Sequence, residues 1–419
     1  MSGESIISNR LTVVGMVLAG LSASLVGIGL SRFAYTPLVP ALIDAGWFTP
    51  AATAYLGAAN LAGYLAGALA ARHLAARLSA STVLRAMLVL ATASFFASAS
   101  PLSFVWFFAW RFASGLAGGA LMVLAASAIL PHVPAQRRGL ASGVIFAGVG
   151  LGIAASGTLV PLLLRWGLVE TWCALGALAL AFTVLAWRGW PNAPTTTNAP
   201  PVQRRGQREP AALKALYVEY ALNAIGLVPP MVFLVDFVAR GLGKGVDAGA
   251  HYWILFGLGA TAGPVLAGFL ADRIGFRTAL RMALCVQAAA VGLTVLPSGS
   301  AGLIASSLVM GTFVPGIVPL VLGRIQELSA DPDTRQAAWS TATTAFALGQ
   351  AGAAYAFSFL FDLSGSHVVL FELGAGALAL AVIIDVIVAR RVPRSHAPTI
   401  CSRDRGHHLK LFSHHPGVP

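Results

Sequence analysis

Long apolar blocks dominate this sequence, and each is close to the length that an α-helix needs to cross a lipid bilayer. A bilayer core about 30 Å thick requires about 20 helical residues, whereas a transmembrane β-strand shows about ten residues of alternating polarity. Only 10% of the 419 residues are charged, which is too few to form a water-exposed surface. We therefore expect an all-α membrane protein of about twelve transmembrane helices. The predicted spans are residues 11–39, 52–71, 82–99, 103–130, 139–163, 168–187, 214–239, 249–271, 278–296, 301–324, 336–361 and 367–389.

Two polar segments interrupt the apolar pattern, one in the middle of the chain and one at its C-terminal end. Residues 188–213 contain five prolines and a cluster of arginines, and residues 390–419 are basic and contain histidines. Low hydrophobicity with proline and charge is typical of flexible segments. We predict an N-terminal six-helix bundle (1–187), a cytoplasmic linker (188–213), a C-terminal six-helix bundle (214–389) and a disordered basic cytoplasmic tail (390–419). Two related bundles of six helices are a recurrent plan of secondary transporters, which hold substrate between the halves.

The basic residues indicate topology rather than nucleic-acid binding. Of the 27 lysines and arginines, 22 fall in the termini, the linker and alternate loops, and only 3 fall in the opposite loops. This bias is the positive-inside rule, and it predicts that both termini are cytoplasmic. The three cysteines (Cys173, Cys285 and Cys401) form neither a metal-binding spacing nor a disulfide framework. We expect no metal and no cofactor.

A loop motif lies between the eighth and ninth predicted spans, at residues 268–277. It resembles the loop motif of the major facilitator superfamily, in which glycine, three residues, Asp-Arg-x-Gly and basic residues follow one another. The residues that fit are Gly268, Asp272, Arg273, Gly275 and Arg277. The resemblance implies two pseudo-symmetric bundles and a cytoplasmic latch that stabilises the outward-facing state. Arg324 and Glu327, at the end of the tenth span, are the expected partners of Asp272 and Arg273.

The first copy of this motif, after the second span, is eroded. Gly67 and Arg72 align with the superfamily pattern, but Ala71 occupies the acidic position. We therefore expect the latch to depend mainly on the C-terminal copy.

Further segments are similar to a bacterial branch of the superfamily. The fourth span contains an arginine followed by small residues (111–118), which is similar to the fourth-helix motif, with Ser114 in place of glutamine. Together with residues 29–37 and 134–139, the chain resembles the YbfB/YjiJ-like transporters along essentially its whole length. This resemblance implies a transporter and does not specify a substrate.

Two arginines, Arg32 and Arg111, lie inside predicted spans at similar depth. Ionisable residues inside a membrane are costly and are candidates for function. Between Asp44 and Glu170 the sequence contains no acidic residue, so neither arginine has a carboxylate partner in those spans.

Three compensating partners are open: backbone carbonyls, a carboxylate across the cavity, or a bound anion. Asp236 and Glu372 are the available carboxylates, and both fall near outer helix ends, where we expect them to be hydrated. The prediction is therefore an organic anion held between Arg32 and Arg111.

The sequence thus predicts a monomeric secondary transporter of the inner membrane that moves a small solute by alternating access, coupled to an ion such as a proton. The alternatives are an exporter of neutral or lipophilic compounds and a membrane sensor that does not transport. We find no nucleotide-binding motif and no nucleophile elbow, so we do not expect an enzyme. Glu219 is the candidate coupling residue. The candidate substrate-binding residues are Arg32, Tyr35, Asn60, Tyr64, Arg111, Asn223 and Gln350.

Small residues recur at four-residue spacing in several spans. This spacing lets helix backbones approach closely in lipid, so these glycines are predicted to serve helix packing. They are Gly63, Gly67, Gly148, Gly152, Gly259 and Gly263.

Overall fold

The structure is a computed structural model that describes residues 3–134, 138–191, 210–296, 299–329 and 332–391. This part of the chain is built from helices and contains no β-strand. The α-helices are α1 (Gly3–Ser24), α2 (Tyr35–Asp44), α3 (Pro50–Leu78), α4 (Ala80–Ser98), α5 (Phe104–Ile129), α6 (Arg138–Leu164), α7 (Leu168–Ala186), α8 (Ala211–Asp236), α9 (Val246–Ile274), α10 (Phe276–Leu293), α11 (Gly299–Leu328), α12 (Pro332–Ser364) and α13 (His367–Arg391).

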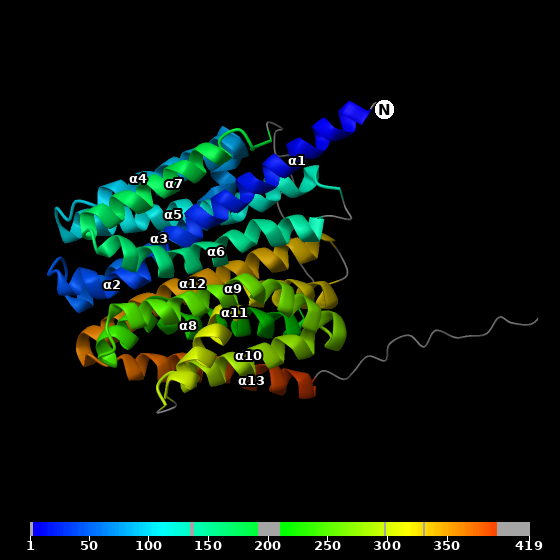
Figure 1. The fold of residues 1–419 in the computed structure, drawn as a ribbon. Helices are drawn as coiled ribbons and strands as arrows, with labels where there is room; N and C mark the ends of the chain where they lie inside the picture. The colour runs from blue at the N-terminus through cyan, green and yellow to red at the C-terminus, as the bar shows by residue number, and fades with distance from the viewer. Residues whose placement is uncertain (1–2, 135–137, 192–209, 297–298, 330–331, 392–419) are drawn as a thin grey trace, which may run out of the picture.

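The helices form two bundles that lie one above the other in Figure 1, with α1–α7 in one and α8–α13 in the other. The bundles meet where α3 packs against α12 and α6 packs against α9. The N-terminus and the end of α13 lie at the same end of the molecule, on the right of Figure 1. We call this the linker end, because α7 ends and α8 begins on that side.

The predicted spans are confirmed. Within the described residues, twelve helical segments are long and apolar enough to cross a membrane, and their boundaries differ from the predicted ones by five residues or fewer. The first span runs to Asp44 rather than residue 39, because α1 and α2 are joined by a π-helix (Leu25–Leu30) and a short turn into one long segment.

The predicted linker (188–213) ends too late, because its last residues belong to helix α8. Helix α8 begins at Ala211, and Leu213 is buried within the C-terminal bundle. Pro210 stands immediately before the helix, where its fixed φ and missing N–H cost least. Helix α13 likewise continues to Arg391. The rest of the predicted linker and tail, residues 192–209 and 392–419, lies outside the described residues.

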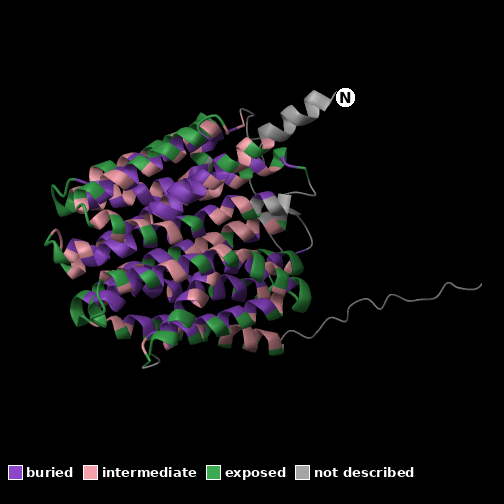
Figure 2. Ribbon diagram, in the orientation of Figure 1, coloured by how far each residue is buried: buried purple, intermediate pink, exposed green. Residues whose placement is uncertain are grey.

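Burial follows the arrangement of the bundles. Large apolar side chains such as Val105, Trp166 and Val265 are exposed, as expected of a protein surrounded by lipid. Figure 2 shows buried residues concentrated on the helices inside the bundles. The span that contains helix α8 is the most enclosed, since 83% of its apolar stretch is buried. Only 22% of the corresponding stretch of α13 is buried. Helix α8 therefore contacts both its own bundle and the other one, and it carries polar residues into the centre of the protein.

The glycine prediction is also confirmed. A Cβ atom added to Gly63 or Gly67 would collide with the backbone of α5, and one added to Gly259 or Gly263 would collide with the backbone of α11. Gly148 and Gly152 meet the first span in the same way. These glycines allow close helix crossings.

Candidate functional site

The first span is interrupted near its middle. Its π-helix ends at Leu30, and the backbone N–H groups of both Arg32 and Phe33 donate to the carbonyl oxygen of Ile28, at 3.2 and 3.4 Å. Residues 31–34 then form a turn before α2 begins at Tyr35. Such irregular backbone inside a membrane needs local polar partners, and π-helical turns often mark functional positions.

Arg111, on α5, supplies one of these partners. Its Nη1 donates to the carbonyl oxygen of Ser31 at 2.8 Å, and Ser114 Oγ donates to the same oxygen at 3.3 Å. The guanidinium group lies 4.2 Å from the ring centroid of Tyr35, whose hydroxyl donates to the carbonyl oxygen of Thr53 at 2.9 Å. Of the three kinds of partner that the sequence left open for Arg111, the one observed is a backbone carbonyl.

Asn60 completes this polar group from α3. Its Nδ2 donates to the carbonyl oxygen of Arg111 at 3.2 Å and to Ser114 Oγ at 3.4 Å. Asn60 and Arg111 are 2% and 3% exposed. The group therefore connects α3, α5 and the turn before α2 inside the N-terminal bundle.

Arg32 lies in a different environment, at the interface between the bundles. Its Nη2 donates to Met231 Sδ at 3.7 Å, and Gln350 Nε2 donates to the same sulfur at 3.9 Å. Met231 belongs to α8 and Gln350 to α12, so donors from both halves converge on one thioether. A thioether is a weak acceptor.

The remaining neighbours of Arg32 are aromatic. Its guanidinium carbon lies 5.1 Å from the ring centroid of Phe33 and 5.6 Å from that of Tyr64. Within the part of the chain that the structure describes, no carboxylate lies at ion-pair distance from Arg32.

Two prolines directly precede Met231 in helix α8. Pro229 and Pro230 are inside the helix and cannot donate backbone hydrogen bonds. Directly after them, the carbonyl oxygen of Met231 accepts a hydrogen bond from Thr36 Oγ1 at 2.7 Å. This bond joins α2 and α8 one turn from Arg32, and it makes the surroundings of Arg32 a junction of the two bundles.

The predicted site residues thus separate into four places. Arg32 and Gln350 both donate to Met231, with Tyr64 beside Arg32, while Arg111, Asn60 and Tyr35 form the group around Ser31. Asn223 is buried in the C-terminal bundle, where its Nδ2 donates to Gln287 Oε1 at 2.8 Å. Glu219 lies near the linker end of α8 and lines a separate pocket there.

The expectation that Asp236 is hydrated was wrong. Its side chain is 1% exposed, and its carboxylate lies 2.7 Å from His367 Nε2 and 3.3 Å from Arg240 Nη1. The residues after α8 form a π-helical turn (Phe237–Gly241), which keeps Arg240 on the same side of the helix as Asp236, and the start of α13 adds His367. Glu372 is exposed, as expected.

The loop motif forms the predicted tight turn, since Gly275 has a φ of +81°. Its expected ion pairs are not formed in this conformation. Arg324 pairs with Glu327 at 2.7 Å, because the two lie one turn apart on α11, and Glu327 also accepts the backbone N–H of Phe276 at 3.3 Å.

The acidic and basic residues of the motif lie apart from that pair. Asp272 is exposed and makes no hydrogen bond or ion pair within the described residues, and the Arg273 guanidinium lies 4.1 Å from the Phe269 ring centroid. The role of these residues in a latch stays a prediction.

Sequence reasoning missed Ser31 and Met231, which accept hydrogen bonds from Arg111 and Arg32. Ser31 acts through its backbone carbonyl, for which its residue type gives no signal. Met231 follows a Pro-Pro pair inside an apolar block, and this pair indicates an irregular helix. Asp385, which lies in the same pocket as Glu219, was also missed, although it is an acid inside the last span.

Comparisons with known proteins agree with this architecture. The structure resembles a crystal structure of the nucleoside transporter NupG, with a TM-score of 0.72 at 13% identity over 91% of this chain and 99% of that one. It also resembles a D-xylose-proton symporter, with a TM-score of 0.69 at 15% identity over 91% and 98% of the two chains. The xylose transporter XylE from E. coli gives a TM-score of 0.66 at 16% identity over 88% and 96%. At these identities the likeness shows the fold alone.

Sequence comparison is more specific. A chloramphenicol resistance protein of Streptomyces lividans is 27% identical over 261 residues, which are 60% of this chain and 66% of that protein. Residues 24–386 match the family described as "Uncharacterised MFS-type transporter YbfB". This match covers most of the chain, including all twelve spans in whole or in large part. The chain therefore belongs to the YbfB-type family of major facilitator superfamily transporters and is a multi-pass membrane protein.

Proposed function

We propose that this protein is a secondary active transporter of the inner membrane that carries a small organic anion by alternating access, with the anion bound at Arg32. The observation that carries the proposal is the convergence of Arg32 and Gln350 on the sulfur of Met231. A charged donor and an amide donor meet there on a weak acceptor, although guanidinium groups bind planar carboxylates far more strongly.

The position of Arg32 supports an anion rather than a structural role. Arg111 has a carbonyl partner at 2.8 Å, whereas the contacts of Arg32 among the described residues are a thioether and two ring faces. A carboxylate that displaced the Met231 sulfur would receive hydrogen bonds from both donors. Its charge would also offset the cost of a guanidinium group inside the membrane.

The same contacts suggest how binding could be linked to movement. Arg32 and Tyr64 belong to the N-terminal bundle, and Met231 and Gln350 belong to the C-terminal bundle. A bound anion would therefore contact both bundles, and rocking of one bundle against the other would expose it to each side in turn.

Counterflow in proteoliposomes tests this proposal. Vesicles that contain the purified protein and an excess of an unlabelled organic acid should accumulate the same labelled acid, because exchange through one site needs no energy source. A panel of mono- and dicarboxylates would be compared with neutral analogues in which the carboxylate is replaced by an amide. Accumulation of the amides alone would overturn the assignment of an anion, and absence of any counterflow would favour a membrane sensor without transport.

Efflux of a neutral compound is a second candidate, favoured by the similarity to a chloramphenicol resistance protein. If it holds, cells that express this protein should tolerate more chloramphenicol than cells with the empty vector. Chloramphenicol should also show counterflow that replacement of Arg32 does not reduce, since a neutral solute needs no guanidinium partner.

The proposed orientation places the linker end in the cytoplasm, from the bias of 22 basic residues against 3. Reporter fusions after residue 200 and at the C-terminus should both give a cytoplasmic signal. A fusion after residue 245, between α8 and α9, should give a periplasmic signal. A periplasmic signal after residue 200 would contradict this orientation.

A further inference from the structure

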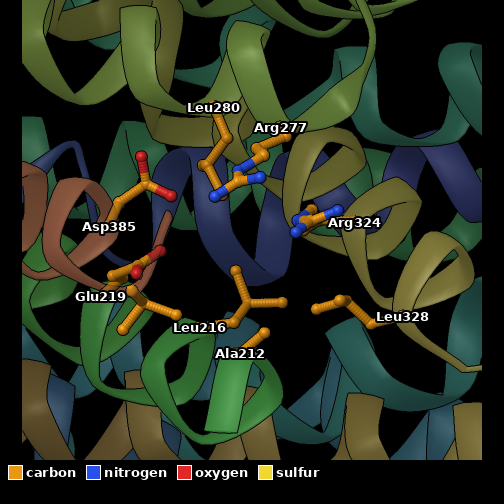
Figure 3. Close-up of a pocket in the computed structure, with 9 residues that line it drawn as sticks. Ala212, Leu216, Glu219, Arg277, Leu280, Arg324, Leu328 and Asp385 are labelled. Carbon is orange, nitrogen blue, oxygen red and sulfur yellow. The ribbon is translucent and has the colours of Figure 1, made fainter. Parts of the chain in front are cut away.

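A charged pocket lies inside the C-terminal bundle, apart from the site around Arg32. It encloses about 60 Å³ near the linker end of α8, between α8, α10, α11 and α13. This volume holds several water molecules. Figure 3 shows the carboxylates of Glu219 and Asp385 on one side of the pocket and the guanidinium groups of Arg277 and Arg324 on the other.

Two of the acids around this pocket have arginine partners. Asp385, on α13, forms an ion pair with Arg281 of α10. Glu327, at the end of α11, pairs with Arg324 at 2.7 Å. Within each pair the opposite charges compensate each other, so neither pair needs a ligand.

Glu219 is different. It is 4% exposed, it lines the pocket, and within the described residues it makes no hydrogen bond or ion pair. The helices around it carry charged residues: α10 presents Arg277 and Arg281, α11 presents Arg324, and α13 presents Asp385. Helix α12 places Trp339 and Phe346 against the neighbouring Tyr220 and adds no ionisable residue to the pocket lining.

A buried carboxylate without a donor is costly as an anion, and it becomes stable when it binds a proton or moves to a cation. Both solutions are available to Glu219. A proton can reach it through the water-sized space of the pocket, and Arg277 and Arg324 face it across that space. An inorganic anion fits less well, because it would lie beside Glu219 and Asp385.

We propose that this pocket is a proton-binding site, in which Glu219 takes up and releases a proton, and that release draws Arg324 from Glu327 toward Glu219. The proton passes between the carboxylate oxygen of Glu219 and water in the pocket, and no other bond changes. Arg324 then has two alternative partners, the exposed Glu327 at the end of α11 and the buried Glu219 on α8.

This exchange would connect the proton to the turn between α9 and α10. Glu327 pairs with Arg324 and also accepts the backbone N–H of Phe276, the first residue of α10. When Arg324 leaves, Glu327 loses its cation and is free to rearrange with the loop motif. The proton state of a residue inside the bundle thereby controls the charged residues at the linker end. This exchange is independent of the solute carried at Arg32.

Infrared spectroscopy of the full chain in lipid nanodiscs, without any solute, tests the proton site. A protonated carboxylic acid has a carbonyl band distinct from that of a carboxylate. We expect wild-type protein to keep such a band in neutral buffer, where exposed acids are ionised, and Glu219→Gln to lose it. The matched control is Glu372→Gln, the same substitution at an exposed glutamate of α13, which should leave the band unchanged. A wild-type spectrum without the band at neutral pH, or a band that survives in Glu219→Gln, would overturn the proposal.

The exchange of Arg324 is tested by two variants with opposite effects. Arg324→Gln removes a cation from the pocket, so the band should persist to a proton concentration about tenfold lower than in wild type. Glu327→Gln frees Arg324 for Glu219, so the band should be lost at a proton concentration about tenfold higher. Shifts in the same direction, or no shift in either variant, would show that Arg324 does not exchange partners. Because no solute is used, these outcomes are independent of whether anion transport at Arg32 holds.

Discussion

Replacement of Arg32 by glutamine is expected to abolish transport of an anionic solute, with a loss of affinity of about 100-fold or more. The substitution removes the only cation at the junction of α2, α8 and α12 for which the described residues supply no carbonyl or carboxylate partner. A solute carboxylate would then be left inside the membrane with the amide of Gln350 as its main donor. Binding would be measured by calorimetry with the acid that gives the strongest counterflow.

Two further variants separate the charge from the geometry. Arg32→Lys keeps the charge but loses the planar donor fork, so we expect binding weakened by about tenfold rather than abolished. Met231→Leu removes the sulfur but no donor for the anion, so affinity should stay close to that of wild type. Each variant should keep the melting temperature of wild type. Normal anion transport by Arg32→Gln would show that this arginine only packs between the bundles.

Arg111 should respond differently from Arg32. Its hydrogen bond to Ser31 joins α5 to the turn before α2, so its loss should lower the stability of the N-terminal bundle as well as activity. We therefore treat Arg111 as a residue that positions α2, and thereby Arg32, rather than as an anion ligand.

The largest effect on stability is expected at the crossing of α3 and α5. A Cβ atom at Gly115 would collide with the carbonyl oxygen of Asn60, so Gly115→Ala must push the two helix backbones apart. Buried backbone atoms have nowhere to move in a close-packed crossing, and we expect a loss of about 3 kcal/mol, at the upper end for overpacking. Thermal unfolding in detergent would show a markedly lower melting temperature.

The matched control for this substitution is Gly376→Ala, inside α13. A Cβ atom at Gly376 has nothing within 4 Å, and alanine favours a helix over glycine. Gly376→Ala should therefore be as stable as wild type or slightly more so. Equal melting temperatures for the two variants would contradict the role given to the α3–α5 crossing.

Most of the fold could be predicted from the sequence, because membrane spans are signalled by the length and charge content of continuous segments. The twelve spans were predicted to within five residues, and the turn at Gly275 and the close crossings of Gly63 and Gly67 were identified from local motifs. Each of these features depends on residues that are near one another in the chain. Bilayer thickness sets the length of a span, and glycine alone permits a positive φ or a very close backbone.

The arrangement of the polar residues was decided only by the tertiary structure. Spans that are apolar on every side do not indicate which face turns toward a neighbouring helix. The similar depth of Arg32 and Arg111 in their spans therefore could not predict that Arg111 binds a carbonyl oxygen and Arg32 a thioether. Asp236 was expected in water and is buried against His367, because the start of α13 lies beside the end of α8. The pocket of Glu219 and Asp385 combines residues from four helices. Sequence alone therefore determined how many spans the chain forms and, to within five residues, where each begins and ends. The rotation and contacts of those helices decided which buried charges have partners, since partners in a bundle come from helices far apart in the chain.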